Sequence, residues 1–193
     1  MEHPVEGLVG RYFPERQGQI RAFAQLLASA GIERGLIGPR EGERIWDRQI
    51  FNCLPVTKLL PQGASLFDIG SGAGLPGIVV ALARPDLKVT LIEPLERRVE
   101  FLKEATAGLD IEVIRGRAQD VKKSADFVTA RAVAPLEKLK KISWHMVKTG
   151  GALLAMKGES AAAEMEGVKN AVLHEIELEG IGLGRIVELR KGA

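Results

Sequence analysis

Hydrophobic residues recur with a helical period at the start of the chain. In residues 15–30 the apolar side chains fall at the spacing i, i+3, i+4, i+7, which predicts an amphipathic helix that ends near Gly31. Those side chains are Ile20, Phe23, Ala24 and Leu27. Residues 41–53 predict a second helix, which Pro55 interrupts. Residues 1–61 are therefore expected to form a small helical cap without strands.

From Ser65, after a junction at Pro61-Gln62-Gly63, the pattern changes to short apolar strands that alternate with helices. Five successive strands are expected at residues 65–69, 88–93, 111–115, 126–130 and 152–156. Helices are expected at residues 76–83, 94–108, 135–147 and 159–169. Pro94 is expected to open its helix, because proline is favoured in the first turn. That helix would place Leu95, Val99 and Leu102 on one face.

Repeated strand–helix units predict a mostly parallel, Rossmann-like sheet with helices on both faces. The last two apolar segments, residues 172–178 and 184–190, flank a glycine-containing loop and predict an antiparallel pair. Residues 62–193 are therefore expected to form one α/β domain, with the cap packed on it as a single unit.

A glycine-rich loop follows the first predicted strand. Residues 66–77 read Leu-Phe-Asp-Ile-Gly-Ser-Gly-Ala-Gly-Leu-Pro-Gly, so Gly70, Gly72 and Gly74 alternate. A loop without Cβ atoms lets another molecule approach the backbone, and the next helix points free N–H groups at it. This arrangement predicts a nucleotide-type cofactor pocket at the carboxyl end of a parallel sheet.

Two acidic residues indicate which cofactor the loop binds. Glu93 ends the second strand about twenty residues after the glycines, where a ribose-binding carboxylate is expected. Asp68 precedes the loop. A carboxylate at this position would repel a pyrophosphate but would attract an amino group or a sulfonium. The order of acid and glycines therefore favours S-adenosylmethionine over a dinucleotide. Five parallel strands closed by an antiparallel pair are also the strand order of S-adenosylmethionine-dependent methyltransferases.

Composition places the chain among ordinary globular proteins. Its 193 residues are 46% apolar and 27% charged, which suits one domain with a small appendage. One cysteine excludes an intrachain disulfide and is compatible with a reducing cytosol. No secretory signal and no apolar run long enough to span a membrane is seen, so we expect a cytoplasmic protein without a membrane partner, and favour a monomer.

The formal net charge is only +2, but the cations are clustered. The clusters are Arg44/Arg48, Arg97/Arg98, Arg115/Arg117, Lys122/Lys123 and Lys138/Lys140/Lys141. Clusters on one face can attract phosphates without a large net charge. Each cluster can equally be a solvated helix surface.

Several motifs together resemble the RsmG family, also called GidB. They are the loop Asp68–Gly77, the segment from Glu93 to Arg97-Arg98, the block Thr129–Val133 and the tripeptide Met156–Gly158. The resemblance extends from about residue 20 to the end. It implies methylation of N7 of one guanine in bacterial 16S ribosomal RNA, with the small ribosomal subunit as partner.

The resemblance also implies cofactor contacts at Gly70, Leu75, Ala118, Gln119 and Arg131. Asp68, Gly72 and Glu93 complete the expected S-adenosylmethionine site. The family more often has glutamate where this chain has Gln119, so Asp120 is the alternative acceptor. In the cap the family usually shows Trp-x-x-His, whereas this chain reads Trp46-Asp-Arg-Gln49. Whether Gln49 contacts RNA or only packs is left open.

The chemistry expected at this site needs no general base. Guanine N7 carries a free lone pair, so alignment and desolvation are sufficient. The stretch after the fourth strand lacks the Asn/Asp-Pro-Pro-aromatic motif of amine-directed enzymes, and Cys53 has the spacing of a packing residue rather than a nucleophile. Arg131 is expected to position the cofactor carboxylate, a guanine edge or a phosphate. A surface salt bridge is its alternative.

The RNA-facing rim is expected to contain Arg44, Arg48, Arg97, Arg98 and Lys157, with Lys122 and Lys123 as further members. No metal site is expected, because His3, His145 and His174 have no ligand spacing. Three other functions remain open at this point: a small-molecule methyltransferase, a non-catalytic RNA-binding or assembly factor, and a dinucleotide-dependent oxidoreductase.

Overall fold

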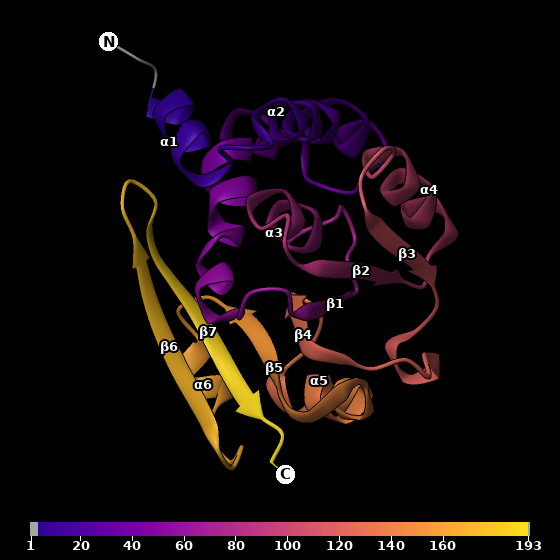
Figure 1. The fold of residues 1–193 in the computed structure, drawn as a ribbon, viewed down its shortest axis with the longest axis vertical. Coiled ribbons are helices and arrows are strands. Elements are labelled where there is room, and N and C mark those ends of the chain that lie inside the picture. The colour runs from indigo at the N-terminus through magenta and orange to yellow at the C-terminus, as the bar shows by residue number, and fades with distance from the viewer. Residues whose placement is uncertain (1–3, 193) are drawn as a thin grey trace.

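A computed structural model describes residues 4–192 and contains one seven-stranded sheet in the order β3-β2-β1-β4-β5-β7-β6 (Figure 1). The strands are β1 (Ser65–Ile69), β2 (Lys88–Glu93), β3 (Ile111–Arg115), β4 (Ala125–Arg131), β5 (Val147–Lys157), β6 (Ala171–Leu178) and β7 (Gly182–Arg190). The first five strands pair in parallel, and β7 pairs antiparallel with both β5 and β6. The predicted strand order is confirmed.

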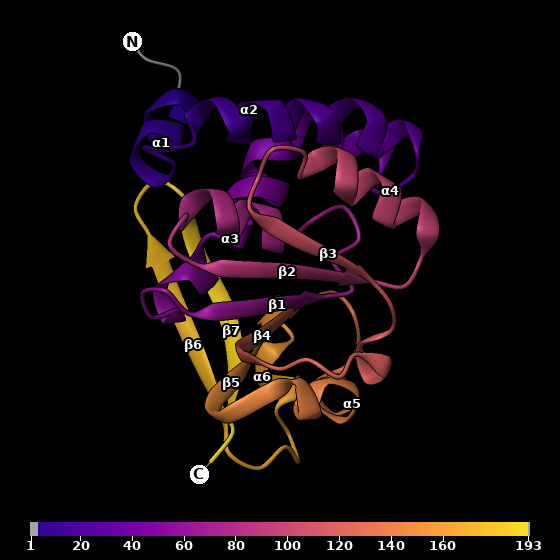
Figure 2. The same cartoon turned by 45° about the vertical axis from the view of Figure 1, so that its right-hand side comes forward.

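The sheet is covered by helices on both faces (Figure 2). One face carries α2 (Gln17–Leu26), α3 (Gly77–Ala83) and α4 (Glu96–Ala105), and the other carries α5 (Leu136–Ser143) and α6 (Ala161–Glu164). Successive strand residues point to opposite faces, so Leu66 joins the first core and Phe67 the second. Central strands buried on both faces explain the continuous apolar runs in the sequence.

The cap is helical, as predicted, but it is not made of regular α-helices throughout. It begins with α1 (Pro4–Tyr12), a helix that was not predicted from the sequence. After α2, π-helical and 3-10 turns run through Leu27–Gly31 and then from Pro39 to Leu59. Pro55 sits at the start of its 3-10 segment, where a proline is tolerated because no intrahelical N–H is needed there.

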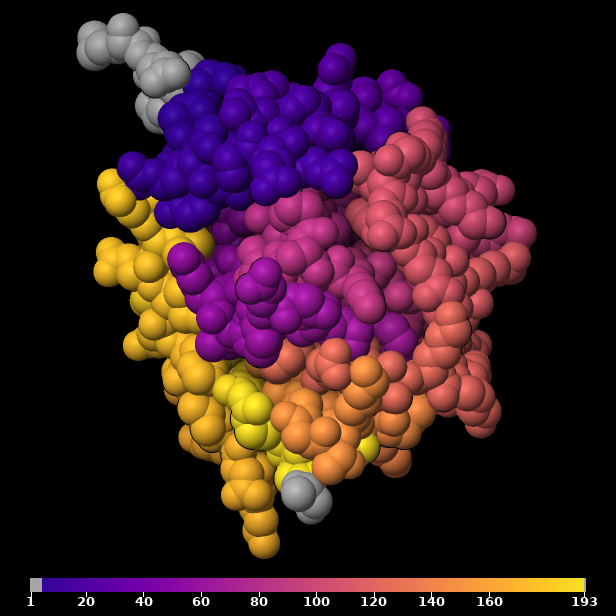
Figure 3. Space-filling view, viewed as in Figure 1, coloured from indigo at the N-terminus to yellow at the C-terminus, as the bar shows by residue number. Residues whose placement is uncertain are grey.

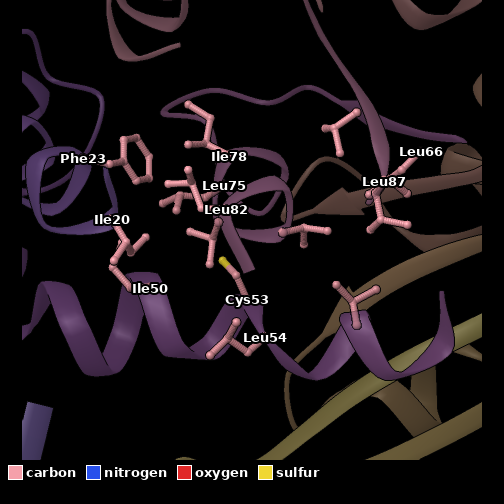
Figure 4. Packing of buried hydrophobic residues seen from close by; sticks show 14 of the residues in the cluster. Ile20, Phe23, Ile50, Cys53, Leu54, Leu66, Leu75, Ile78, Leu82 and Leu87 are labelled. Carbon is pink, nitrogen blue, oxygen red and sulfur yellow. The ribbon is translucent and has the colours of Figure 1, made fainter. Parts of the chain in front are cut away.

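The cap and the sheet share one hydrophobic core (Figure 4). Ile20 and Phe23 from α2 meet Ile50 and Cys53 from the second half of the cap, and all face the α3 region. The residues there are Leu75, Ile78 and Leu82. Fully burying each such side chain stabilises the fold by roughly 1.5–3 kcal/mol, so the cap is held firmly over the sheet.

The N-terminal helix α1 lies against the tip of the β6–β7 hairpin, whereas the C-terminal end of β7 lies at the opposite side of the molecule (Figures 1 and 3). The hydroxyl of Tyr12 in α1 donates a 2.9 Å hydrogen bond to the Glu179 carbonyl, and Arg11 Nη1 lies 2.7 Å from a Glu179 carboxylate oxygen. Tyr12 therefore fastens the cap to the hairpin.

Three predicted helix boundaries were wrong. Helix α4 begins at Glu96 instead of Pro94, because the Glu93 carboxylate accepts the N–H of Leu95 and holds that residue extended. Leu95 is consequently 50% exposed and does not share the buried face of Val99. Helix α5 ends at Ser143, and β5 begins at Val147, earlier than expected. A long helix was expected at residues 159–169, but only the four residues of α6 are α-helical there.

No helix within residues 4–192 is long and apolar enough to cross a membrane.

Candidate functional site

The glycine loop leaves the carboxyl end of β1 in a backbone conformation that glycine favours. Gly70 has φ of +65°, and its N–H donates to the Ile92 carbonyl of the neighbouring strand at 2.8 Å. Gly77, at the start of α3, allows close packing: a Cβ there would lie 2.6 Å from Oδ2 of Asp68. The sequence repeats glycine here because both the turn and the helix–strand contact require it.

Asp68 lies fully buried beneath the loop. Its Oδ2 accepts the N–H of Gly77 at 2.9 Å, whereas its Oδ1 has no hydrogen-bond partner among the described residues. Burial raises the pKa of this carboxyl to about 7, because desolvation outweighs the bond from Gly77. A buried acceptor without a partner is costly, so this oxygen is suited to a donor or a cation supplied by a ligand.

Glu93 is also buried, with 1% of its surface exposed. One carboxylate oxygen accepts the N–H of Gly72 at 2.9 Å, and the other accepts the N–H of Leu95 at 3.0 Å. The side chain therefore braces the glycine loop from β2. Each oxygen keeps a second lone pair, and contact with a ribose remains a prediction.

A cavity of about 330 Å³ opens between the loop, the cap and the end of β4; we call it the glycine-loop cavity. Its volume lies within the range of ~300–1,000 Å³ typical of small-molecule sites. The predicted site residues that line it are Gly70, Gly72, Leu75, Arg98 and Arg131. From the cap come Leu36, Ile37, Gly38, Glu41 and Gln49, of which only Gln49 was discussed from the sequence.

Arg131 connects the end of β4 to the cap. Its Nη2 donates to Oε1 of Gln49 at 2.6 Å, and Nη1 donates to the Gln49 carbonyl at 3.3 Å. The Gln49 amide in turn donates to Oε2 of Glu41 at 2.7 Å. No carboxylate in residues 4–192 forms a salt bridge with Arg131, so the surface salt bridge considered as an alternative is not present there. No ion pair therefore neutralises the positive charge of Arg131 at the wall of the cavity.

The neighbouring cap residues mainly pack. Trp46 lies 5.6 Å from Phe51, measured between ring centroids. Cys53 is fully buried, its thiol donates to the Gln49 carbonyl at 3.0 Å, and burial raises its pKa to about 11. The thiol is therefore protonated at neutral pH, which confirms the expected packing role.

The loop after β4 has a feature that the sequence could not show. Ala132 adopts φ of +54°, although it is not glycine. This left-handed conformation costs roughly 1–2 kcal/mol, and such residues cluster at functional sites. Next to it Val133, 38% exposed, covers Gly70: a Cβ on Gly70 would lie 2.8 Å from Val133 Cγ2. A ligand lying on Gly70 must therefore move the Val133 side chain.

A second cavity, of about 430 Å³, shares Arg131 and Ala132 with the first; we call it the β5–β7 cavity. Its remaining lining residues are Asn52, Pro55, Met156, Lys157, Gly158, Glu159, Glu164, Leu183, Gly184, Arg185 and Ile186. The side chain of Lys157 is only 10% exposed, because its Nζ lies 2.6 Å from Oε2 of Glu164 and donates to the Ala134 carbonyl at 3.0 Å. It is therefore a partnered cation inside a cavity, not a solvated surface lysine.

The other predicted site residues lie around these cavities. Arg44, Arg48, Arg97 and Lys122 are exposed, and Lys123 is paired with Glu112 at 2.5 Å. Ala118 and Gln119 form a short 3-10 turn after β3 and do not line the glycine-loop cavity. Their cofactor contacts and the RNA contacts of the arginines remain predictions.

The residues present fit S-adenosylmethionine. The loop supplies glycines that a ligand can approach, and Oδ1 of Asp68 is an unsatisfied buried acceptor near them. Among the described residues no group of three or more His, Cys, Asp or Glu side chains is arranged to hold a metal ion. His145 contacts the Val121 carbonyl, His174 contacts Glu188, and His3 lies outside the described residues.

Comparisons with known proteins agree with this geometry. The family model described as GidB, rRNA small subunit methyltransferase G, matches residues 16–181. A protein of Kineococcus radiotolerans named ribosomal RNA small subunit methyltransferase G is 53% identical over 171 residues, covering 86% of this chain and 67% of that protein. A protein of Mycolicibacterium gilvum with the same name is 47% identical, covering 93% of this chain and 84% of the relative.

Solved structures show the fold. A methyltransferase of Pyrococcus furiosus superposes with a TM-score of 0.56 at 17% identity, covering 72% of this chain and 83% of that one. A ribosomal protein L11 methylase of Lactobacillus delbrueckii superposes with a TM-score of 0.57 at 15% identity, covering 73% of this chain and 77% of that one. The sheet is therefore that of the methyltransferase fold, as expected from the strand order.

Proposed function

The chain belongs to the rRNA small subunit methyltransferase G (GidB) family, and we propose that it methylates N7 of a guanine in 16S ribosomal RNA with S-adenosylmethionine as methyl donor. The observation that carries this proposal is the glycine-loop cavity, which has Arg131 at its wall and is lined by the loop that follows Asp68, a buried residue whose Oδ1 is unpaired. The small ribosomal subunit would be the partner, and the cytoplasm the place of action.

When bound, S-adenosylmethionine supplies an electrophilic methyl group on a sulfonium. We assign its binding to Asp68, Gly70, Gly72, Leu75 and Glu93, with Ala118 and Gln119 at the adenine end. Asp68 offers an acceptor that the protein itself leaves unused. Glu93 holds Gly72 in place, so the loop is formed before the ligand arrives.

The residues around the acceptor position it and exclude water. Guanine N7 has a free lone pair, so no proton has to leave before attack and no general base is required. Leu75 and Val133 provide apolar surface on the loop side. Arg131 is fixed by Gln49 and presents a charge that can orient a guanine edge or a phosphate.

The alternatives raised by the sequence have less support. A dinucleotide-dependent oxidoreductase does not match a sheet that ends in an antiparallel pair or a family of rRNA methyltransferases. No observation in the structure favours a small-molecule substrate or a non-catalytic assembly factor over RNA methylation.

The proposal is tested by following tritium from S-[methyl-³H]adenosylmethionine. The purified protein is incubated with 16S rRNA and, separately, with small subunits from cells that lack the gene. We expect label in the RNA. We also expect binding of RNA to weaken steeply with added salt, because exposed arginines that contact phosphates displace counterions from the RNA. Binding of S-adenosylmethionine without label in either RNA substrate would contradict the proposed substrate.

A further inference from the structure

The β5–β7 cavity lies at the carboxyl ends of β4 and β5, where β7 begins. Arg131 and Ala132 form a wall that it shares with the glycine-loop cavity. Two cavities that share a wall containing one strained residue, Ala132, suit a reaction between two substrates that must meet at that wall. Since the first cavity is assigned to the methyl donor, the second is available to the acceptor.

Apolar side chains line part of the β5–β7 cavity. Pro55 comes from the cap, Met156 from β5, and Leu183 and Ile186 from β7. Leu183 is 49% exposed, which makes it one of the few large apolar side chains that the described part of the chain leaves in solvent. A flat, unstacked base is the kind of ligand that such a surface can cover.

Two cations that line the cavity are neighbours on adjacent strands. Lys157 on β5 and Arg185 on β7 are directly paired in the antiparallel register. Like charges in this position repel each other, so each is offset by a carboxylate: Glu164 lies 2.6 Å from Lys157, and Glu175 lies 2.9 Å from Arg185. Only the Nε of Arg185 takes part in a hydrogen bond within residues 4–192. The rest of its guanidinium fork can bind a phosphate.

Two carboxylates, Glu159 and Glu164, also line the cavity. Glu164 is already engaged, because its Oε2 lies 2.6 Å from Lys157 Nζ and its Oε1 accepts from Ser160 Oγ at 3.2 Å. Glu159 is exposed and, when ionised, is the carboxylate that can accept hydrogen bonds from a ligand. Guanine presents two donor groups, N1–H and the N2 amine, on its Watson–Crick edge, whereas adenine presents an acceptor at N1. A guanine held by that edge keeps N7, which lies on the opposite edge, free for methylation.

We propose that the β5–β7 cavity binds the acceptor guanine nucleotide, with Arg185 on its phosphate, Glu159 on its Watson–Crick edge, and Leu183 and Met156 against the base. This assignment rests on the proposed function for the choice of guanine. It makes Arg185 and Glu159 specificity-determining residues that neither the sequence motifs nor the glycine loop indicates.

Methyl NMR of methionine tests this assignment without requiring methyl transfer. The chain has four methionines, of which Met156 lines the cavity and Met146 is fully buried in the other core. Protein labelled with [methyl-¹³C]methionine is titrated with guanosine 5′-monophosphate and with adenosine 5′-monophosphate, and the Met156 signal is assigned with Met156→Leu. We expect guanosine monophosphate to shift the Met156 signal saturably, to leave the Met146 signal in place, and to bind more tightly than adenosine monophosphate.

Matched variants separate ligand binding from the Arg185–Glu175 ion pair. Arg185→Gln should weaken binding of guanosine monophosphate about fivefold to tenfold, whereas Glu175→Gln, which breaks the same ion pair, should bind as tightly as wild type or more tightly. An unmoved Met156 signal, or equal losses in the two variants, would overturn the assignment. Failure of RNA methylation with an intact Met156 response would instead contradict the proposed function alone.

Discussion

Nη2 of Arg131 lies 2.6 Å from Oε1 of Gln49, although the two residues are 82 positions apart in the chain. This hydrogen bond joins the carboxyl end of β4 to the helical cap, at the wall that both cavities share. Gln49 stands where the resemblance to the family led us to expect histidine. In this chain the amide can serve both neighbours, because it accepts from Arg131 and donates to Glu41.

Replacing Gln49 by alanine should destabilise the protein and slow catalysis. The amide is buried, and its loss removes the donor to Oε2 of Glu41 and the shortest hydrogen bond that Arg131 makes. Hydrogen bonds to charged groups contribute about 1.5–3 kcal/mol, so the free energy of unfolding in urea should fall by about that amount. Asp47→Ala, on the exposed side of the same helical segment (Ile45–Ile50), is the control and should change little. Equal stability of Gln49→Ala and wild type would show that the bridge does not stabilise the fold.

Replacing Arg131 by alanine should reduce methyl transfer more than it reduces stability. The guanidinium contacts the cap and faces both cavities, so its removal should lower kcat by at least about tenfold through lost positioning. Arg131→Lys should not restore activity, because an ammonium cannot reproduce the planar fork. Rates are to be compared with circular dichroism and melting temperature. Unchanged turnover of a folded Arg131→Ala variant would remove Arg131 from the site.

Replacing Gly70 by alanine should weaken binding of S-adenosylmethionine. The position has φ of +65°, and an added Cβ would lie 2.8 Å from Val133 Cγ2. The backbone strain alone costs roughly 1–2 kcal/mol, and the methyl group also occupies the face where the ligand is expected. Gly18→Ala in α2 is the matched control, since a Cβ there meets nothing within 4 Å. Calorimetry should show a raised Kd for the first variant only; similar affinities in both would argue against a ligand on Gly70.

Asp68 should give both stability and cofactor binding a distinctive pH dependence. Burial raises the pKa of this carboxyl from 3.8 to about 7, so between these values the folded protein holds a proton that the unfolded chain has released. Because the folded state binds more protons, the contribution of Asp68 to stability is greatest at low pH and is lost as pH rises toward 7. Asp68→Asn should remove this slope, which is measured as the difference in unfolding free energy between the two proteins. A constant difference from pH 4 to 8 would contradict the raised pKa.

A cationic ligand should reverse the cost of ionising Asp68. If S-adenosylmethionine places a positive group near Oδ1, its affinity should increase as pH rises through about 7 in wild type and remain flat in Asp68→Asn. Calorimetry across this pH range measures the effect. The same profile in both proteins would show that Asp68 does not sense the ligand.

The sheet could be predicted from the sequence because its strands carry local signals. β1 and β2 are short, mainly apolar segments, followed by Gly70 and Pro94, and their predicted bounds, residues 65–69 and 88–93, are those of the structure. The hairpin of β6 and β7 was likewise marked by glycines in its turn. Such signals are local, so one sequence is sufficient to read them.

The rest of the site depends on contacts between residues distant in sequence. The Arg131–Gln49 bond, the packing of Val133 on Gly70 and the positive φ of Ala132 have no local signature. The start of α4 was misplaced for a similar reason, since Glu93 satisfies the N–H of Leu95 and delays the helix. Side chains that satisfy backbone groups override the propensity of proline to begin a helix.

The most direct test of the account is to locate the transferred methyl group. 16S rRNA from cells that lack the gene is incubated, alone or in small subunits, with the purified protein and S-[methyl-¹³C]adenosylmethionine, and its nucleosides are analysed by mass spectrometry. We predict ¹³C-labelled 7-methylguanosine in 16S rRNA with wild type and a large loss of it with Arg131→Ala. Label in another nucleoside, or no label with a protein that binds S-adenosylmethionine, would contradict the account.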